Sequence, residues 1–206
     1  MTPPNPRDIV RDGYDAVSYR YRGDDDDPEP YSMWATALTA RLTAGATVLD
    51  LGCGCGVPMT RTLAARGVSV TGVDVSRVQI ERARSLVPGA TFVWADAIDV
   101  DFRPESFDAV ICLYALIHVP ETEQPTILAN VRRFLRPGGW FLATTGSQAW
   151  TGTEEAWLGG DAPMWWSHAD AATYRRWLAG AGLRIESEEF VPEGDSGHQL
   201  FSARAG

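Results

Sequence analysis

Between residues 47 and 113 the chain alternates short apolar runs with segments of helical character, and this alternation restricts its fold more than any other feature. The runs at residues 47–51, 68–73, 91–95 and 107–113 have the length of strands and are rich in Val, Thr and Phe. Parallel strands need a long crossover between them, which a helix supplies. Strands that alternate with helices at this spacing therefore predict an α/β fold with a parallel sheet covered on both faces.

Capping residues set the limits of the helices. Gly67 ends the helix after the first strand, and Ser76 with Gln79 forms a capping box at the start of the next one. Pro137 and Gly138 turn the chain into a fifth strand. The predicted helices span residues 58–66, 77–86 and 121–135, and the fifth strand spans residues 140–145.

The region before the first strand is predicted to be helical. Asn5 and Pro6 are a cap and first-turn pair, which predicts a helix over residues 6–19. Apolar residues at every fourth position from Trp34 predict a second helix that stops at Gly45. These two helices are additions to the alternating core.

A helix and a hairpin are expected near the end of the sequence. Ser167, with Asp170 three residues later, is expected to cap a helix that ends near Gly182. Residues 184–191 and 199–203 alternate like strands, and turn-forming residues join them. One edge of the sheet is therefore expected to be antiparallel.

Composition restricts the partners and the compartment. The 206 residues suit one domain, and the net charge of −9 disfavours nucleic acid, which needs a basic surface. No run reaches the roughly 20 apolar residues that cross a membrane, and no signal peptide is visible. The three Cys residues are odd in number and unlike a secreted disulfide framework. We expect a cytoplasmic protein, monomeric or homodimeric, without nucleic-acid or membrane partners.

Two clusters raise the question of a metal. The acidic run from Asp24 to Asp27 is expected to be a solvated linker, because like charges repel and stay hydrated. The alternative, a cation site, lacks the glycine and the spaced ligands of a calcium loop. Cys53 and Cys55 lack a second ligand pair at a useful spacing. We therefore expect no metal.

A glycine-rich turn, Gly52-Cys53-Gly54-Cys55-Gly56, lies between the first strand and the next helix. Glycines there let the backbone pass close to a ligand and point amides toward it. Asp74 ends the second strand, where a carboxylate can accept hydrogen bonds from both hydroxyls of a ribose. Asp96 ends the third strand, where it can accept from an adenine amino group. The pattern predicts a nucleoside site.

The spacing of the glycines separates two kinds of nucleoside ligand. A dinucleotide site uses the pattern G-x-G-x-x-G and helix amides for a pyrophosphate, whereas this turn reads G-x-G-x-G and its helix begins with Pro58, which has no N–H. Asp50, Asp74 and Asp96 make the site acidic. A ligand with a sulfonium, an ammonium, a ribose and an adenine suits these carboxylates better than a nicotinamide dinucleotide.

Taken together, these segments resemble the class I S-adenosylmethionine-dependent methyltransferases. The likeness spans about residues 45–145 and is greatest to the small enzymes of ubiquinone and menaquinone biosynthesis type, in which a segment like residues 11–15 folds over the cofactor. Residues 48–56 resemble motif I, residues 73–76 the ribose-binding acidic motif, residues 95–97 the adenine-contacting segment, residues 107–112 motif IV, and residues 135–139 the turn before the fifth strand.

The resemblance implies a single Rossmann-like three-layer sandwich. Its seven-stranded, mostly parallel sheet would have the order 3-2-1-4-5-7-6, with strand 7 antiparallel, and the extra N-terminal helices would lie beside it. The single domain, residues 1–206, would comprise an N-terminal helical cap over the cofactor (1–44), a cofactor-binding core (45–147), a substrate lid (148–167), and the last helix with the hairpin (168–206).

The resemblance also assigns roles to single residues. Asp74 would hold the ribose, Leu113 would offer its carbonyl to the methionine ammonium, and Tyr14 or Tyr19 would close the site. Gly52 and Gly54 would lie against the methionine part, and Val75, Asp96 and Ala97 would surround the adenine. Asp50, Cys53 and Gly56, in or beside the glycine turn, are the remaining expected cofactor contacts.

The methyl group of a sulfonium is already activated, so the protein's task is to align the acceptor with it for in-line displacement and to exclude water. His118 follows the fourth strand and is a candidate base or acceptor-orienting group, although it also suits a hydrogen-bonded helix start. His168 is a candidate substrate contact together with Trp165 and Trp166, although it lies beside a helix cap, where local capping geometry is the simpler explanation. Trp165 and Trp166 belong to a Trp-rich segment that is either a lid or core packing.

The expected function is methylation of a small molecule, aromatic or apolar if the lid interpretation holds, as in secondary metabolism. The alternatives are a non-methylating reaction on the same cofactor fold, such as a cyclisation or rearrangement, and a protein that binds the cofactor without turnover.

Overall fold

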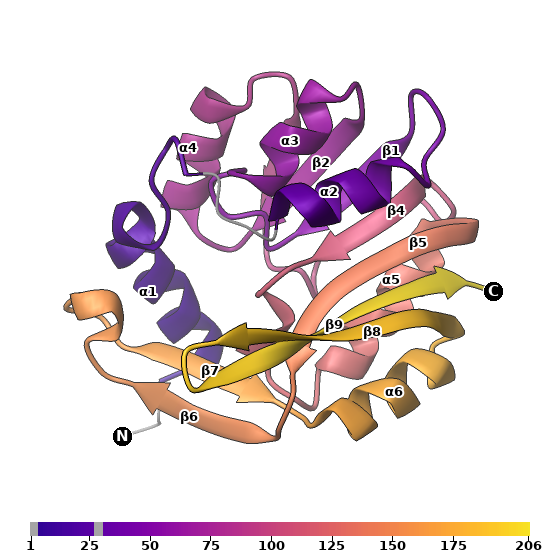
Figure 1. The fold of residues 1–206 in the computed structure, drawn as a ribbon. Coiled ribbons are helices and arrows are strands. Elements are labelled where there is room, and N and C mark those ends of the chain that lie inside the picture. Colours follow the sequence, from indigo (N-terminus) through magenta and orange to yellow (C-terminus); the bar gives the residue numbers. More distant parts are fainter. Residues whose placement is uncertain (1–3, 27–30) are drawn as a thin grey trace.

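A seven-stranded sheet forms the centre of the molecule (Figure 1). The computed structural model describes residues 4–26 and 31–206. The strands of the sheet are β1 (Thr47–Leu51), β2 (Ser69–Asp74), β3 (Thr91–Trp94), β4 (Phe107–Cys112), β5 (Leu135–Gly146), β8 (Leu183–Glu193) and β9 (Ser196–Ala205). Their order is β3-β2-β1-β4-β5-β9-β8; the first five are parallel, and β9 is antiparallel to both neighbours.

Helices cover both faces of the sheet. The helices α2 (Tyr31–Thr39), α3 (Met59–Ala65) and α4 (Arg77–Leu86) lie on one face, and α5 (Gln124–Phe134) and α6 (Ala171–Gly180) lie on the other. Alternation along β1 produces these two layers: Val48 packs against α2 and α3, whereas Leu49 and Leu51 pack against α5. The core is thus divided by the sheet, as the strand–helix alternation predicts.

The α/β fold class is confirmed. The Trp-rich segment forms two strands of its own, β6 (Trp150–Glu154) and β7 (Met164–His168), in a separate antiparallel sheet. Counted within the large sheet alone, β8 and β9 are therefore the sixth and seventh strands. The β6–β7 pair was not predicted, although Gly159, Gly160 and Asp161 between the two strands are turn-forming residues.

Two predicted boundaries were wrong. Ser167 lies in β7 and caps nothing; the cap of α6 is Asp170, whose side chain accepts the Thr173 amide at 2.8 Å. A short acidic side chain in extended backbone fulfils this role as well as a hydroxyl. The chain also enters β5 at Leu135, directly after α5, so residues 137–139 lie within the strand, where they interrupt its pairing with β4, and regular pairing resumes at Trp140.

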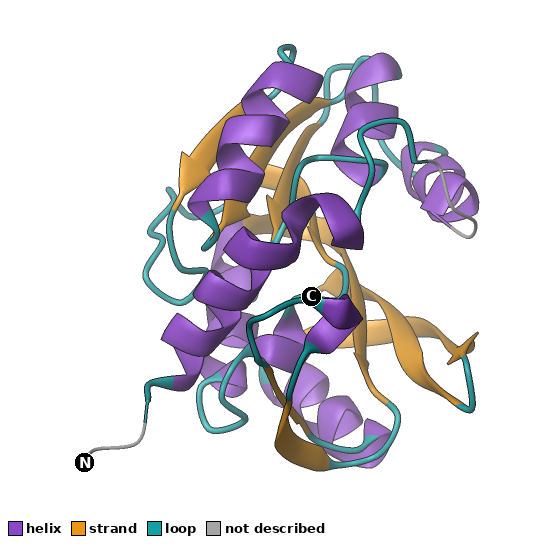
Figure 2. Cartoon of the chain, turned by 90° about the vertical axis from the view of Figure 1, so that its left-hand side faces the viewer, coloured by secondary structure: helices purple, strands orange, loops and turns teal. Residues whose placement is uncertain are grey.

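The first helix, α1 (Pro6–Tyr21), begins as predicted, with the Asn5 side chain accepting the Arg7 amide. Figure 2 shows the side of the molecule on which α1 lies, and this helix is in front of the strands. Polar contacts fix it to α4: Asp15 accepts the Val78 amide at 3.2 Å, and Arg82 donates to the Ser18 carbonyl at 2.8 Å. The helix is therefore held in place over the carboxyl ends of β1, β2 and β4.

The acidic run is exposed in the part that the structure describes, which agrees with the predicted solvated linker, but it also contacts the core. Asp24 forms an ion pair with Arg82 of α4, and Arg61 of α3 donates to the carbonyls of Asp24 and Asp26 at 2.7 and 3.2 Å. Asp27 lies outside the described residues. The run fastens the end of α1 to two core helices.

Candidate functional site

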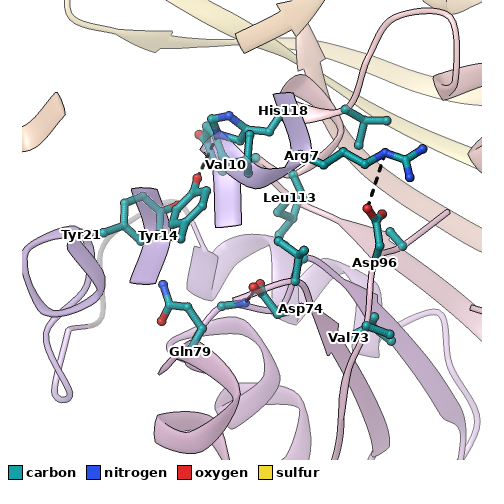
Figure 3. Close-up of a pocket in the computed structure, with 18 of the residues that line it drawn as sticks. Arg7, Val10, Tyr14, Tyr21, Val73, Asp74, Gln79, Asp96, Leu113 and His118 are labelled. Atoms are coloured by element: carbon teal, nitrogen blue, oxygen red, sulfur yellow. Dashed lines mark hydrogen bonds and ion pairs between the residues drawn. The ribbon is translucent and has the colours of Figure 1, made fainter. Parts of the chain in front are cut away.

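A crevice opens at the carboxyl ends of the parallel strands and is closed on its outer side by α1 (Figure 3). Strand ends contribute Asp74 and Leu113, and α4 contributes Gln79. On the opposite side of the space, Figure 3 shows Tyr14 of α1 beside His118 of η1 (Leu116–His118). Crevices at this edge are where open α/β sheets bind their ligands.

The glycine turn forms the floor of the crevice, and its glycines serve different purposes. Gly52 has φ of +75°, and a Cβ atom there would lie 2.1 Å from the Ala115 side chain, so packing requires this glycine. Gly54 has φ of +54°, and a Cβ atom would meet only the Gln79 amide nitrogen, at 3.9 Å. Gly56 faces the Phe92 ring and does not line the crevice, contrary to its predicted cofactor contact. Only the first two glycines are positioned to receive a ligand.

Asp74 is held by two backbone amides. Its two carboxylate oxygens accept from the Gly54 and Ser76 amides, each at 2.8 Å. Burial raises the pKa of this carboxyl to about 6, and the two amide hydrogen bonds oppose that rise. Each carboxylate oxygen can accept more than one hydrogen bond, so the group keeps acceptor capacity toward the crevice that it lines.

Asp96 lies at the far end of the crevice and accepts the Ile98 amide at 3.1 Å. Arg7 from the first turn of α1 lies 3.7 Å from its second oxygen, the dashed contact in Figure 3, and also binds Glu123. Val75 and Ala97 line the same end of the crevice. Arg7 was not predicted from the sequence; a basic residue in the first turn of a helix expected to cover an acidic site is the signal that was available.

A second, smaller pocket continues from the glycine turn, and we call it the glycine-turn pocket. It is lined by Asp50, Cys53 and Leu113 from the core and by Arg22 from the end of α1. Asp50 is buried and accepts from the Thr60 hydroxyl at 2.6 Å, and burial raises the pKa of its carboxyl to about 7. Arg22, which was also not predicted from the sequence, places a guanidinium in the same pocket as the Asp50 carboxylate.

His118 is neutral and has both ring nitrogens occupied. Its Nδ1 lies 2.8 Å from the Trp165 carbonyl, which can only accept, so the proton is on Nδ1. Its Nε2 therefore accepts from the Tyr14 hydroxyl at 2.9 Å. Burial lowers the pKa of His118 to about 4. His118 thus lines the crevice, but its lone pair already accepts the hydrogen bond from the Tyr14 hydroxyl.

Of the two candidate closing tyrosines, only Tyr14 reaches the crevice. Tyr19 is 67% exposed, and the Arg82 guanidinium lies 3.9 Å from its ring centroid on the outer surface. Tyr21 lies seven residues, about two turns, beyond Tyr14 and so shares its face of α1 and lines the crevice with it. The prediction of Tyr19 was wrong because five residues bring the chain to a different side of a helix.

An aromatic cavity of about 400 Å³ adjoins both pockets. It has walls in common with them, because Tyr14, Tyr21, Tyr114 and His118 also line the crevice, and Tyr21, Arg22 and Tyr31 also line the glycine-turn pocket. The residues that line this cavity but neither the crevice nor the glycine-turn pocket are Ile117, Trp157, Leu158, Trp166, Val191, Pro192, Glu193 and His198.

The Trp-rich segment contributes less to this cavity than predicted. Trp166 lines the cavity and packs on the His118 ring with centroids 4.2 Å apart. The Trp165 side chain does not line it; this residue acts through its backbone carbonyl. His168 is bound to the Gln148 carbonyl at 2.6 Å and also lies outside the lining. Alternation along β7 directs Trp165 and Trp166 to opposite faces, which the prediction of a loop-like lid did not include.

Three side chains around these spaces have buried polar atoms without a hydrogen-bond partner among the described residues: Gln79 Nε2, Trp166 Nε1 and His198 Nδ1. A buried polar atom without a partner costs about 1–3 kcal/mol, so such atoms are typical of places where a ligand supplies the missing bond. With the carboxylates and the open face of Gly54, the donor and acceptor set fits S-adenosylmethionine. No group of three or more potential metal ligands occurs in residues 4–26 and 31–206. Nor does any helix in this part of the chain have the length and apolar character needed to cross a membrane.

Comparison with known proteins agrees with this fit. Residues 48–139 match the methyltransferase domain family. The chain is 34% identical over 161 residues, 68% of its length, to the 27-O-demethylrifamycin SV methyltransferase of Amycolatopsis mediterranei, of which it covers 58%. It spans about half the length of the curated relatives that it matches.

Solved structures share the fold. The magnesium protoporphyrin IX methyltransferase of Synechocystis with bound S-adenosylmethionine superposes over the whole of both chains, with a TM-score of 0.78 and 19% identity. A [4+2]-cyclase superposes over 98% of this chain and 96% of its own, with a TM-score of 0.74 and 20% identity.

The fold is that of the class I methyltransferases, and the crevice residues fit S-adenosylmethionine, the cofactor of such enzymes. Residues 48–139 carry that family's sequence signature in this chain. The closer likeness to the ubiquinone and menaquinone subgroup stays a prediction.

Proposed function

We propose that this protein transfers the methyl group of S-adenosylmethionine to a small, mainly apolar or aromatic acceptor that carries a hydroxyl group. The observation that carries the proposal is the common wall: Tyr14, Tyr21, Tyr114 and His118 border both the acidic crevice and the aromatic cavity. A ligand in the crevice and an acceptor in the cavity would meet across these rings. Such contact without intervening water is what in-line methyl transfer requires.

The crevice residues divide between the parts of the cofactor. Asp74 would accept from the ribose hydroxyls, since amides already hold its carboxylate. Asp96, Val75 and Ala97 would surround the adenine. Gly52, Gly54 and the Leu113 carbonyl would border the methionine part. When bound, the cofactor supplies a methyl group on a positively charged sulfur.

The glycine-turn pocket would hold the charged end of the methionine. Asp50 offers a carboxylate for the ammonium, and Arg22 offers a guanidinium for the carboxylate, since both line this pocket. The methionine ammonium and carboxylate would each form an ion pair with the protein, so both protein charges would be paired where water is scarce. Binding of the ammonium would give a role to Asp50, whose burial raises its pKa.

The remaining segments would enclose the acceptor. We assign the N-terminal region, residues 1–44, as the cap over the cofactor, because the described part of α1 closes the crevice. Residues 148–167 would form the acceptor lid on the core of residues 45–147, and residues 168–206 would complete the sheet and the cavity wall. One relative is named as a 27-O-demethylrifamycin SV methyltransferase and another as an O-methyltransferase, and both names support a secondary-metabolite acceptor with an oxygen nucleophile.

A test supplies methyl-labelled S-adenosylmethionine and a panel of hydroxylated aromatic compounds, and measures labelled products and S-adenosylhomocysteine by mass spectrometry. Labelled ether together with equimolar S-adenosylhomocysteine is the expected result. The fold of the [4+2]-cyclase gives a second candidate, a non-methylating reaction on the same fold. Tight cofactor binding with no S-adenosylhomocysteine for any acceptor would favour that candidate and contradict methyl transfer.

A further inference from the structure

The aromatic cavity contains a second histidine, to which the sequence alone gave no role. His198 lies near the start of β9, opposite Gly146 of β5 and Val191 of β8. Its side chain is 14% exposed and lines the cavity. Two strands therefore fix its backbone, while its ring belongs to the cavity wall.

The neighbours of His198 define its tautomer. Its Nε2 lies 3.0 Å from the Glu193 carboxylate, which can only accept, so the neutral ring carries its proton on Nε2. The His198 contact lowers the pKa of Glu193, so this carboxyl stays ionised. The other nitrogen, Nδ1, then bears a lone pair, and it is buried with no partner among the described residues. A carboxylate that orients an imidazole in this way prepares the opposite nitrogen to accept a proton.

His118 offers the instructive contrast. Both of its nitrogens are occupied, by the Trp165 carbonyl and the Tyr14 hydroxyl, and burial lowers its pKa to about 4. It lines the crevice, but its lone pair is not free. His198 has the free lone pair and a carboxylate partner.

The ring of Tyr114 lies between His198 and the proposed cofactor position. Tyr114 lines both the crevice and the cavity, and its ring meets the His198 ring edge to face with centroids 5.1 Å apart. Trp166, with its unpartnered indole N–H, lines the same cavity. Within the described part of the chain, the cavity thus presents one unsatisfied hydrogen-bond acceptor and one unsatisfied donor among aromatic walls, which suits a phenol that carries a second oxygen.

Building on the proposed function, we infer that the Glu193–His198 pair binds the hydroxyl of a phenolic acceptor and accepts its proton. The acceptor O–H bond breaks and the proton moves to Nδ1, giving an imidazolium paired with the Glu193 carboxylate. The phenolic oxygen forms the new O–CH₃ bond as the C–S bond breaks, and that electron pair stays on sulfur. The other charged and titratable groups that line the cavity with His198 and Glu193 are Arg22, His118, Tyr14, Tyr21, Tyr31 and Tyr114. His168 lies outside the lining but also interacts electrostatically with His198.

The test uses 2-naphthol as the acceptor probe and His198→Gln as the main variant, because the glutamine amide replaces Nε2 but offers nothing at Nδ1. At pH 7 we expect its kcat to fall about 100-fold or more, with KM and S-adenosylhomocysteine affinity within about threefold of the original. Above about pH 10, where a phenol ionises by itself, activity should return. Glu193→Gln should show a smaller loss, and Glu189→Gln, an exposed carboxylate on the same strand, none.

A second measurement separates this inference from the proposed function. The chain has three His residues, so the imidazole NMR signals of the S-adenosylhomocysteine complex can be assigned with single variants. Addition of 2-naphthol should shift the His198 signal, whereas 2-methoxynaphthalene, which lacks the hydroxyl, should not. A His198 shift without any methylation would contradict the proposed function but support this binding site. Methylation that keeps its rate and pH profile in His198→Gln would overturn the inference and leave the function intact.

Discussion

The crevice and the aromatic cavity share four side chains but are built in different ways. The crevice depends on backbone: amides of Gly54 and Ser76 fix Asp74, and a close contact with Ala115 fixes Gly52. The cavity depends on side chains from segments far apart in the chain. Backbone geometry leaves little room for change, whereas side chains can be exchanged one at a time. We therefore expect substitutions in the crevice to cost stability or cofactor affinity, and those in the cavity to alter the acceptor.

The largest expected effect tests the rigidity of the crevice floor. Gly52→Ala adds a Cβ atom 2.1 Å from the Ala115 side chain at a residue with φ of +75°. Strain in the left-handed region and overpacking together should lower the free energy of unfolding by about 3 kcal/mol. Urea denaturation measures it.

Gly45→Ala is the matched control for this prediction. Gly45 has φ of +76°, but nothing lies within 4 Å of the position that a Cβ atom would take, so only the backbone strain of about 1 kcal/mol should appear. Equal losses for the two substitutions would show that contact with Ala115 does not limit the glycine turn, and the description of a rigid floor would then be wrong.

The second effect concerns Asp74. Asp74→Ala should weaken S-adenosylmethionine binding by about 2.5 kcal/mol, close to 100-fold, because hydrogen bonds to a charged group are lost. Calorimetry gives the affinity. Asp101→Ala, which removes an exposed carboxylate, should leave it unchanged. An unaltered affinity in Asp74→Ala would remove the ribose assignment.

The third effect is a pH dependence that originates in Asp50. Its folded-state pKa of about 7 lies above the usual value of 3.8, so the folded chain binds this proton more tightly than the unfolded chain does. The free energy of unfolding of the cofactor-free protein should therefore fall as pH rises from about 4 to 7, by about 2 kcal/mol between pH 5 and pH 7 from this group.

Asp50→Asn removes that titration and keeps an oxygen for the Thr60 hydroxyl. Its unfolding free energy should depend less steeply on pH than that of the original protein, measured by urea denaturation at several pH values. An unchanged slope would mean that Asp50 is ionised throughout this range, and that its burial does not raise its pKa in the folded protein.

Local sequence predicted the crevice well because its parts are close together in the chain or at the ends of strands. Asp74 is the last residue of β2, Asp96 lies two residues beyond the end of β3, and the parallel order brings these ends to one edge. Arg7, Arg22 and Tyr21 escaped prediction because their place depends on how α1 crosses that edge. The tilt of a helix over a sheet is set by tertiary contacts such as that between Arg82 and Ser18.

The cavity was harder to predict for the same physical reason. Trp166 and Trp165 are neighbours, but strand alternation directs only one of them to the cavity. His198 and Glu193 come together across the β8–β9 turn, and the pairing of Glu193 with Ser196 sets their distance. A hairpin was predicted there, but its register was not, and a shift by one residue would turn His198 to the other face.

The smallest expected effect concerns Tyr14, whose side chain lines both the crevice and the cavity. Tyr14→Phe removes the hydroxyl that donates to His118 Nε2 but keeps the ring contacts with Tyr21 and Trp157, whose centroids lie 5.2 and 5.4 Å away. One lost hydrogen bond should lower the unfolding free energy by about 1 kcal/mol and leave cofactor affinity within about twofold. Thermal denaturation and calorimetry measure the two quantities, with the exposed Tyr19→Phe as the control. If cofactor affinity instead fell tenfold or more, the Tyr14 hydroxyl would have to contact the cofactor directly, and the separation of crevice from cavity at this ring would have to be abandoned.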